Sequence, residues 1–426
     1  MDTLSLADHL HRAALESPEA TAVLSGDRAW TFRTWLDDAS ALAASHEQTG
    51  RPHRQSGTSL ELALAAAACN LQNRAFFPVD RSKSENPLQT GISLPESLPD
   101  VALIIATSGS EGPPRAVLLG NAQLDAAASA ANALMALRPG DLWLNCLPLY
   151  HIGGQSILWR SARAGAGVLL HEGFDAERIA GDLASRAVTH ISLVPAMLAR
   201  LLDAGAVPSP ALRVAMIGGA ALSSSLYERA MTAGWPLYVS YGMSETSAQI
   251  AAHTPADGPW HEGRVGHLMP GHQIRLDDDG RIRLRGWQVM RGYLDGGGID
   301  SEGWLRTGDL GKIDRDGCLS ILGRADDLLI SGGVNIHPQQ VESCLAACPG
   351  VTDVAVTGRP DPIWGDLVVA LVVGEVAPTD LLAHARQHLP SAALPRRIRQ
   401  VARLPRNATG KLQRHELRQW ASEADA

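Results

Sequence analysis

The chain has 426 residues, which is more than one ordinary hydrophobic core accommodates and predicts two or three domains. Hydrophobic residues make up 45% of the chain and charged residues 19%, a composition typical of a globular protein and not of a disordered or fibrous one. The formal net charge is -8, and Lys and Arg are dispersed without a basic stripe, which argues against a nucleic-acid partner.

The start of the chain and the cysteines indicate a cytoplasmic protein. Residues 1–9 lack the basic start and apolar stretch of a signal peptide, and no window reaches the roughly 18 uninterrupted apolar residues of a membrane span. The five cysteines have no metal-site spacing. Cys344 and Cys348 lie four residues apart on an expected helix, without an accompanying group of Cys or His residues, so we expect reduced core thiols.

The first hundred residues predict mainly helix. Residues 5–50 carry Leu, Ala and Trp at helix-compatible spacings, and the Ala-rich segment 60–69 predicts a buried helix. A polar run with Pro and Ser at 81–99 predicts a surface connection. Little between residues 51 and 99 could then supply the strands of a sheet.

From residue 101, short apolar runs alternate with amphipathic segments. Such alternation predicts an α/β fold, a layered domain with largely parallel sheets. The expected strands are 101–106, 141–147, 167–170, 190–194 and 214–217, and the expected helices are 121–136, 154–163, 176–186 and 196–204.

The last part of the chain changes character twice. Residues 263–322 have a β-rich pattern with turns at 278–280 and 314–317. We expect a large N-terminal domain over 1–323 and a small α+β C-terminal domain over 324–426. In the small domain the expected elements are helices at 338–347 and 379–388 and strands at 351–357 and 367–373.

A loop of small residues follows the first of the expected α/β strands, with the sequence TSGSEGPPR over 107–115. Glycines allow the backbone to approach a polyanion closely, and amide and hydroxyl groups donate hydrogen bonds to phosphate oxygens. Arg115 adds a cation at the end of the loop. The G-K-[ST] ending of a Walker loop is missing. Taken alone, a small-residue turn after a strand explains this segment equally well.

Four further motifs follow the loop: YGMSET at 241–246, GWLRTGD at 303–309, GRADD at 323–327 and NATGK at 407–411. In this order, the five segments resemble the motifs of the acyl-CoA synthetase, adenylation-domain and luciferase superfamily, and five ordered motifs rarely arise by chance. The resemblance runs from about residue 100 to residue 415. Two positions depart from the usual loop: Glu111 stands where Thr is typical, and Arg115 where Lys is typical.

The resemblance implies an enzyme that uses ATP and Mg²⁺ to form an acyl-AMP from a small-molecule carboxylic acid, and then passes the acyl group to coenzyme A. Glu245 would be the magnesium ligand. Asp309 would bind the ribose hydroxyls, because a carboxylate can accept two hydrogen bonds. The residues implied in ATP binding are Thr107, Ser108, Gly109, Ser110, Gly112, Arg115, Gly219, Ala220, Tyr241, Ser244, Asp309 and Arg324.

The resemblance also implies a mobile C-terminal domain. Lys411 would enter the active site and stabilise the negative charge that develops on the carboxylate and the α-phosphate. Asp326 matches the hinge about which the small domain rotates. Rotation would withdraw Lys411 and open a channel for the coenzyme A thiol near Gly332 and Gly333. Without the surrounding match, Lys411 would be taken for an exposed tail lysine.

The segment LPLYHIGGQSILWR at 147–160 is the most informative about the acid. Amino-acid-activating relatives commonly carry an aspartate near the position of His151, so its absence argues against an amino-acid substrate. The resemblance gives His151 a catalytic or gating role and places Gly242 in the pocket lining. Together with residues 189–195 and 241–249, the segment is most similar to the superfamily branch that activates o-succinylbenzoate for menaquinone biosynthesis.

That diacid brings a second carboxylate, which needs a cationic partner in the pocket. Arg160 lies nine residues after His151 on an expected helix and is the candidate. Gln249 is a candidate for hydrogen bonds to the acid. A surface arginine or an ion pair within the domain would explain Arg160 nearly as well.

Three alternatives stay open at this point: another aryl or short-chain acyl-CoA ligase, a stand-alone adenylation enzyme that loads a carrier protein, and a catalytically silent ATP-binding paralogue. The presence of Glu245, Asp309, Arg324 and Lys411 together argues against the silent paralogue, whereas Glu111 favours it. The oligomeric state is also open, a homodimer included.

Overall fold

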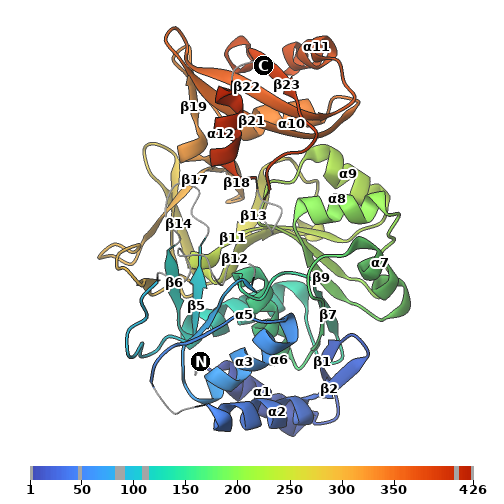
Figure 1. Ribbon diagram of the computed structural model, residues 1–426, viewed down its shortest axis with the longest axis vertical. Coiled ribbons are helices and arrows are strands. Elements are labelled where there is room, and N and C mark those ends of the chain that lie inside the picture. Colours follow the sequence, from blue (N-terminus) through green and yellow to red (C-terminus); the bar gives the residue numbers. More distant parts are fainter. Residues whose placement is uncertain (1–2, 47–49, 82–91, 108–114, 407–411, 424–426) are drawn as a thin grey trace.

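The computed structural model describes residues 3–46, 50–81, 92–107, 115–406 and 412–423. Figure 1 shows a large lobe, coloured blue to yellow along the chain, and a smaller orange and red lobe formed by the last part of the chain. The α/β fold class expected from the sequence is confirmed. Within these ranges, no helix combines the length and the apolar character that a bilayer crossing requires.

The N-terminal region contains a strand hairpin that the helical spacing did not predict. Helices α1 (Leu6–Glu16) and α2 (Phe32–Ser45) flank strands β1 (Thr21–Ser25) and β2 (Arg28–Thr31), so the expectation of helix throughout 5–50 was wrong. Gly26 has φ of +59°, which suits the tight turn between the two strands. Strand β1 also pairs in parallel with β8 (Gly167–Leu170), far along the chain, and this pairing overrides local propensity.

The second correction concerns residues 51–99, which do supply strands. Strands β3 (His53–Gln55) and β4 (Phe76–Pro78) pair in parallel across helix α3 (Ser59–Leu71). Both are three residues long, too short for a periodic pattern to be recognised. They complete a five-stranded sheet with β5 (Leu103–Ala106), β6 (Ala116–Leu119) and β16 (Gly292–Tyr293), in the order β16-β6-β5-β4-β3.

The larger sheet has 13 strands, and its parallel part matches the expected α/β alternation. Helices pack on both faces of these parallel strands. Both faces are therefore buried, and the strands are continuous apolar runs in the sequence. Along β10, Val214 and Met216 belong to one core and Ala215 and Ile217 to the other. The further elements here are β7 (Leu142–Asn145), β9 (His190–Leu193), β10 (Val214–Ile217), β11 (Leu237–Met243), α5 (Asn121–Met135), α6 (Ile152–Ala164), α7 (Ala176–Ser185), α8 (Pro195–Asp203) and α9 (Ser224–Thr232).

The β-rich segment expected over 263–322 extends the same sheet with antiparallel strands. The expected turns join β14 to β15 and β17 to β18, with Gly280 and Gly317 at φ near +80°. The strands are β12 (Ala248–His253), β13 (Arg264–Leu268), β14 (His272–Leu276), β15 (Arg281–Gly286), β17 (Leu305–Ile313) and β18 (Leu319–Arg324). Short 3-10 helices are η2 (Ser244–Thr246), η3 (Pro255–Asp257), η4 (Ala325–Asp327) and η5 (Ser391–Ala393).

The small lobe has its own five-stranded sheet and its own apolar core, which includes Val341, Leu345, Val356 and Val368. The four elements expected there are present, and β19, β20, β23 and α12 were not anticipated. The elements are β19 (Leu329–Ser331), β20 (Val334–Ile336), α10 (Pro338–Ala346), β21 (Val351–Asp361), β22 (Gly365–Gly374), α11 (Pro378–His388), β23 (Arg397–Gln400) and α12 (Arg414–Ser422).

One expectation about the small lobe was wrong. Helix α11 packs beside α10 and brings His384 and His388 next to Cys344, so this cysteine does have a group of histidine neighbours. Sequence spacing could not reveal the group, because 40 residues separate Cys344 from His384.

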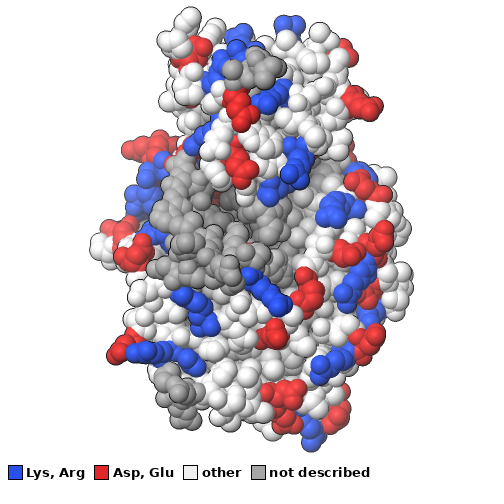
Figure 2. Space-filling model, viewed as in Figure 1, with Lys and Arg blue, Asp and Glu red and all other residues white. Residues whose placement is uncertain are grey.

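Charged side chains of both signs are interspersed over the face shown in Figure 2. On this face the described residues form no extended basic patch, in line with the dispersed Lys and Arg of the sequence.

Candidate active site

Three of the residues expected to bind ATP meet around the carboxylate of Asp309 on β17. The Tyr241 hydroxyl donates a hydrogen bond to Oδ2 of Asp309 at 2.7 Å, and Nη1 of Arg324 lies 3.2 Å from Oδ1. Burial, reinforced by the negative charge of Asp309, raises the pKa of Tyr241 well above its usual value, so its proton stays on the oxygen. Each carboxylate oxygen has two lone pairs, so Asp309 can accept two further hydroxyl donors.

Glu245 lies in η2, directly after strand β11. Its Oε1 accepts a hydrogen bond of 2.8 Å from the hydroxyl of Tyr293, which orients the carboxylate. A half-buried carboxylate is the kind of hard oxygen ligand that Mg²⁺ prefers, so the residue present fits the expected metal. Next to it, Ser247 and Ala248 have φ of +53° and +100°, values that L-residues rarely adopt and that cluster at functional sites.

The described ends of the expected phosphate loop are held together. Thr107 N–H donates to the carbonyl of Arg115 at 2.8 Å, where antiparallel β5 and β6 come together. The guanidinium of Arg115 lies 3.6 Å above the ring centroid of Tyr293 and 2.9 Å from Asp295. The hydrogen bond to Asp295 raises the pKa of Arg115, so the loop ends in a permanent cation. Ser108, Gly109, Ser110 and Gly112, like Glu111, lie outside the described residues.

The remaining expected nucleotide contacts lie at the carboxyl ends of adjacent parallel strands. Gly219 and Ala220 follow β10, and Ser244 follows β11, which pairs with β10 in parallel. Ligands of open α/β sheets bind at this edge of the sheet. The hydrogen bond between Tyr241 of β11 and Asp309 of β17 connects this edge with the polar residues of β17 and β18.

Arg160 is buried, so the alternative of a surface arginine is wrong. Only 2% of the residue is exposed, and its Nη2 donates a hydrogen bond to Oε1 of Gln249. The guanidinium also lies 5.5 Å from the ring centroid of Trp143. Among the described residues no Asp or Glu forms an ion pair with Arg160, and its Nε has no hydrogen-bond partner. The alternative of a packing ion pair therefore finds no support in this part of the chain.

This uncompensated charge is energetically costly. Burial lowers the pKa of Arg160 to about 9, because the charged form has lost its water and no acid among the described residues replaces it. An anionic group entering beside Arg160 would restore the missing partner. Arg160 and Gln249, predicted separately for the acid pocket, thus form one polar unit between α6 and β12.

Gly242 lies directly beside Gln249 of this unit, and His151 lies at the far end of α6 from Arg160. His151 is the N-cap of α6, the helix that carries Arg160, and its ring centroid lies 4.7 Å from that of Tyr150. Gly242 pairs with Gln249 across β11 and β12. A Cβ at residue 242 would lie 1.9 Å from the carbonyl oxygen of Ala248, so only glycine fits the bulged register.

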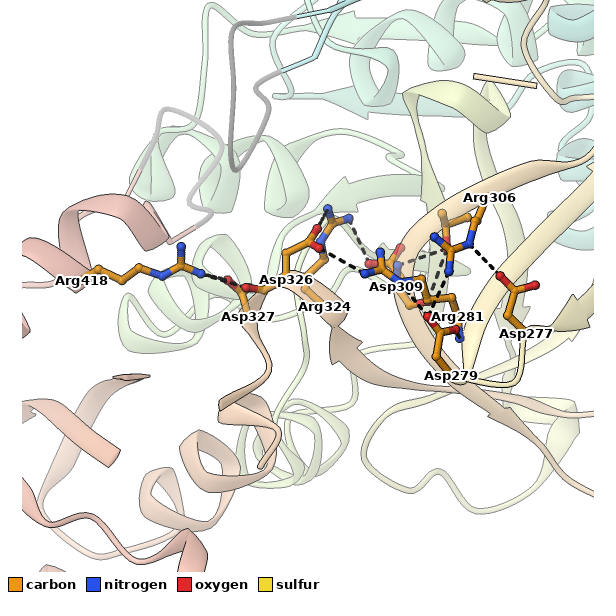
Figure 3. A network of polar contacts seen from close by, with 10 residues as sticks. Asp277, Asp279, Arg281, Arg306, Asp309, Arg324, Asp326, Asp327 and Arg418 are labelled. Carbon is orange, nitrogen blue, oxygen red and sulfur yellow. Dashed lines mark hydrogen bonds and ion pairs between the residues drawn. The ribbon is translucent and has the colours of Figure 1, made fainter. Parts of the chain in front are cut away.

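The side-chain carboxylates of two adjacent acids, Asp326 and Asp327 in η4, pair with arginines of opposite lobes (Figure 3). Asp326 lies 3.5 Å from Arg281 and 3.7 Å from Arg324, which belong to the large lobe. Asp327 lies 3.4 Å from Arg418 and 3.5 Å from Arg414, both on α12 of the small lobe. Figure 3 also shows that Asp309, Arg306, Asp277 and Asp279 continue the polar network through the large lobe.

Gly332 and Gly333 form the two-residue turn between β19 and β20. Their φ values are +58° and +77°, the pattern of a type I′ hairpin, which requires positive φ at both positions. The turn alone explains this glycine pair, and the role in coenzyme A binding stays a prediction. Lys411 lies outside the described residues, next to a bridge between Arg406 and Leu412.

Sequence reasoning missed Tyr293 and Asp295, which link the loop cation to Glu245. Neither belongs to one of the five motifs, and Tyr293 lies 48 residues from Glu245. A Tyr in a two-residue strand and an Asp in the turn after it carry no chemical signal of their own. Only the pairing of β16 with β6 brings them to the site.

Comparisons with known proteins agree with this arrangement of a nucleotide edge, an acid pocket and a second lobe. Residues 46–294 match the model of the family described as AMP-binding enzyme, and residues 340–411 match its C-terminal domain. The chain belongs to the AMP-binding enzyme family.

Named relatives make the comparison more specific. The chain is 33% identical to 2-succinylbenzoate–CoA ligase of Bacillus pumilus (strain SAFR-032), over 96% of both chains. It is 38% identical to the enzyme of the same name from Bacillus cereus (strain Q1), over 80% of this chain and 74% of the relative. Among solved structures, o-succinylbenzoate CoA synthetase of Bacillus subtilis in complex with the acyl-adenylate intermediate matches with a TM-score of 0.86 and 28% identity, over 98% of each chain. The same enzyme has been solved with ATP and a magnesium ion and matches with a TM-score of 0.85.

Proposed function

We propose that this protein is an acid–CoA ligase that activates 2-succinylbenzoate with ATP and transfers the acyl group to coenzyme A, as in menaquinone biosynthesis. The family membership and the named relatives support the reaction class. The observation that supports this substrate is the environment of Arg160. It is a buried cation that is hydrogen-bonded to Gln249 and forms no ion pair with an acid among the described residues. A substrate with a carboxylate beyond the one that reacts supplies the missing anion.

The chemistry follows from the poor electrophilicity of a carboxylate. In the first step, a carboxylate oxygen attacks the α-phosphorus of ATP, the bond to the pyrophosphate oxygen breaks, and acyl-AMP forms. In the second step, the thiol sulfur of coenzyme A attacks the acyl carbon, and AMP leaves with the oxygen that the acid contributed. The second step needs no further ATP, because the mixed anhydride already holds a good leaving group.

The residues of the site have different roles in these two steps. Asp309, held by Tyr241 and Arg324, accepts hydrogen bonds from the ribose, and Arg115 binds phosphate at the end of its loop. Glu245, oriented by Tyr293, would hold magnesium, which when bound neutralises charge on the phosphates. Arg160 and Gln249 bind the aromatic carboxylate and direct the succinyl carboxylate toward the nucleotide. His151, at the start of the same helix, borders the acid.

The acceptor and the oligomeric state belong to the same proposal. Coenzyme A is the acceptor, with a phosphopantetheinylated carrier protein as the alternative. The network of Figure 3 supports a boundary between the lobes just after Arg324, the last residue of β18 in the large lobe, with Asp326 as the hinge. A homodimer stays a prediction from the sequence.

The reaction is tested by incubating the protein with ATP, magnesium, 2-succinylbenzoate and coenzyme A. We expect release of pyrophosphate and AMP, and mass analysis should detect the acyl-CoA thioester. Omitting coenzyme A should leave the acyl-adenylate bound to the protein. A panel of monocarboxylic aryl acids and a phosphopantetheinylated carrier protein test the alternatives. Absence of pyrophosphate release with every acid would show that the protein is not an adenylating enzyme.

The hinge is tested by Asp326→Pro, because proline fixes φ and restricts rotation at this residue. We expect one half-reaction to fall by about tenfold or more while the other is largely retained, since the two steps need different lobe orientations. Asp326→Ala is the matched control: it removes the same carboxylate but leaves the backbone free. Pyrophosphate release measures adenylation, and thioester formation from synthetic acyl-AMP measures transfer. Equal losses in both steps, or the same pattern in Asp326→Ala, would contradict the hinge.

A further inference from the structure

A cysteine and two histidines meet on the small lobe, away from the site described above. Cys344 lies on α10, and His384 and His388 lie one turn apart on α11. One potential ligand atom from each of the three side chains lies within 4.8 Å of the others. We propose that Cys344, His384 and His388 form a binding site for a divalent transition metal, with the chemistry of Zn²⁺.

The hydrogen bonds of the two imidazoles fix which nitrogen of each neutral ring carries the proton. Nε2 of His384 lies 3.0 Å from the carbonyl oxygen of Cys344, and Nδ1 of His388 lies 2.9 Å from the carbonyl oxygen of His384. A carbonyl only accepts, so these two nitrogens carry the protons of the neutral rings. The other nitrogen of each ring therefore keeps its lone pair. Metal-binding histidines typically donate their second ring nitrogen to a carbonyl or carboxylate in this way.

The donor set selects the kind of metal. One thiolate and two imidazoles favour Zn²⁺ or Co²⁺ in tetrahedral geometry over the oxygen-seeking Mg²⁺ of the nucleotide site. Three protein ligands leave the fourth position to water or another small donor. Burial raises the pKa of the Cys344 thiol, so binding would release a proton to the solvent. Cys344 is half-buried and His388 is exposed, which leaves a path for the ion.

A second group of the same composition is a weaker candidate. His46, His53 and Cys69 also bring their ligand atoms together, in the N-terminal region. Burial raises the pKa of both the Cys344 and the Cys69 thiol, to about 12 for Cys69, and the full burial of Cys69 leaves an ion no path to its sulfur. The two groups make separate predictions, because each depends on a different cysteine.

A metal held by Cys344, His384 and His388 would join α10 to α11. Helix α10 also contacts the large lobe, because Ser343 donates a hydrogen bond to Glu262 next to Cys344. A ligand that binds the folded state alone raises the melting temperature by mass action. The site would thus stabilise the lobe that moves without touching the reacting atoms.

Full-length protein stripped of metal by a chelator is titrated with Co²⁺, followed by Zn²⁺ as competitor. We expect one Co²⁺ per chain, with a sulfur-to-cobalt charge-transfer band and the strong visible absorption of tetrahedral cobalt, both lost as Zn²⁺ replaces it. Cys344→Ser should abolish the charge-transfer band. His388→Ala, at an exposed position, should weaken Zn²⁺ binding by roughly 100-fold or more in calorimetry. Loss of a residue that only hydrogen-bonds to a metal ligand already lowers metal affinity about 10- to 100-fold.

Two variants serve as matched controls. His415→Ala removes another exposed histidine of the small lobe, and Cys348→Ser another cysteine of the same region. Both should bind Co²⁺ like the wild type. Circular dichroism checks that each variant is folded.

The proposal is overturned by three outcomes. The first is the absence of a thiolate band. The second is a band that survives Cys344→Ser but disappears in Cys69→Ser, which would assign the metal to the N-terminal group. The third is equal Zn²⁺ affinity in wild type and His388→Ala.

Discussion

Lys411→Ala is expected to slow acyl-AMP formation by about 10²- to 10³-fold while thioester formation from preformed acyl-AMP persists. Negative charge builds up on the carboxylate and the α-phosphate only in the first step, so the cation stabilises that transition state and not the second one. Removing one such preorganised donor costs about 10²- to 10³-fold in rate. Pyrophosphate release measures the first step, and thioester formation from synthetic acyl-AMP measures the second.

Lys312→Ala is the matched control for this prediction. Lys312 is an exposed lysine on β17 of the large lobe, and its loss should leave both half-reactions unchanged. Equal loss of both half-reactions in Lys411→Ala would show that the lysine holds the fold or the nucleotide and does not act in adenylation.

Arg160→Ala is expected to raise the KM for 2-succinylbenzoate by about 30-fold or more, because truncating one partner of a buried charge pair costs 2–5 kcal/mol. The KM for ATP should change little, since Arg160 contacts Gln249 and Trp143 and forms no hydrogen bond or ion pair with the expected nucleotide ligands that the structure describes. Steady-state kinetics with each substrate varied in turn measures the two constants.

The decisive comparison uses an analogue that lacks the aromatic carboxylate. Wild type and Arg160→Ala should handle this analogue with similar KM values, because the interaction is then absent in both. Arg160→Lys keeps a charge but loses the forked geometry, and it should lie between the two. Thermal unfolding checks that the cavity left by the side chain does not destabilise the lobe. An unchanged KM for the diacid would remove Arg160 from the acid pocket.

The parts of the fold that sequence predicted are those in which local pattern and tertiary environment agree. Strands such as Gly167–Leu170 and Val214–Ile217 are continuous apolar runs buried on both faces, so their ends coincide with changes of composition. The hairpin of β1 and β2 and the short strands β3 and β4 were missed, because pairing with distant strands defines them. The three to five residues of these strands carry too little periodicity to compete with neighbouring helical spacing.

The candidate site was also predictable only in part. Tyr241, Asp309 and Arg324 were predicted from their motifs, and the structure places them in hydrogen-bond or ion-pair contact. The association of Arg160 with Gln249 was not predictable, because 89 residues separate them and neither type signals the other. Tyr293 and Asp295 show the same limit. A motif identifies the residues that meet a ligand more readily than the neighbours that orient them.

The two neighbouring acids between the lobes have a mechanical consequence. Each lobe neutralises its own carboxylate, Asp326 through Arg281 and Arg324, and Asp327 through Arg414 and Arg418. Rotation of the backbone between Asp326 and Asp327 would move each acid together with the arginines of its own lobe. Reorientation would then leave the charge pairs intact, and alternation between the two steps would be only weakly sensitive to ionic strength.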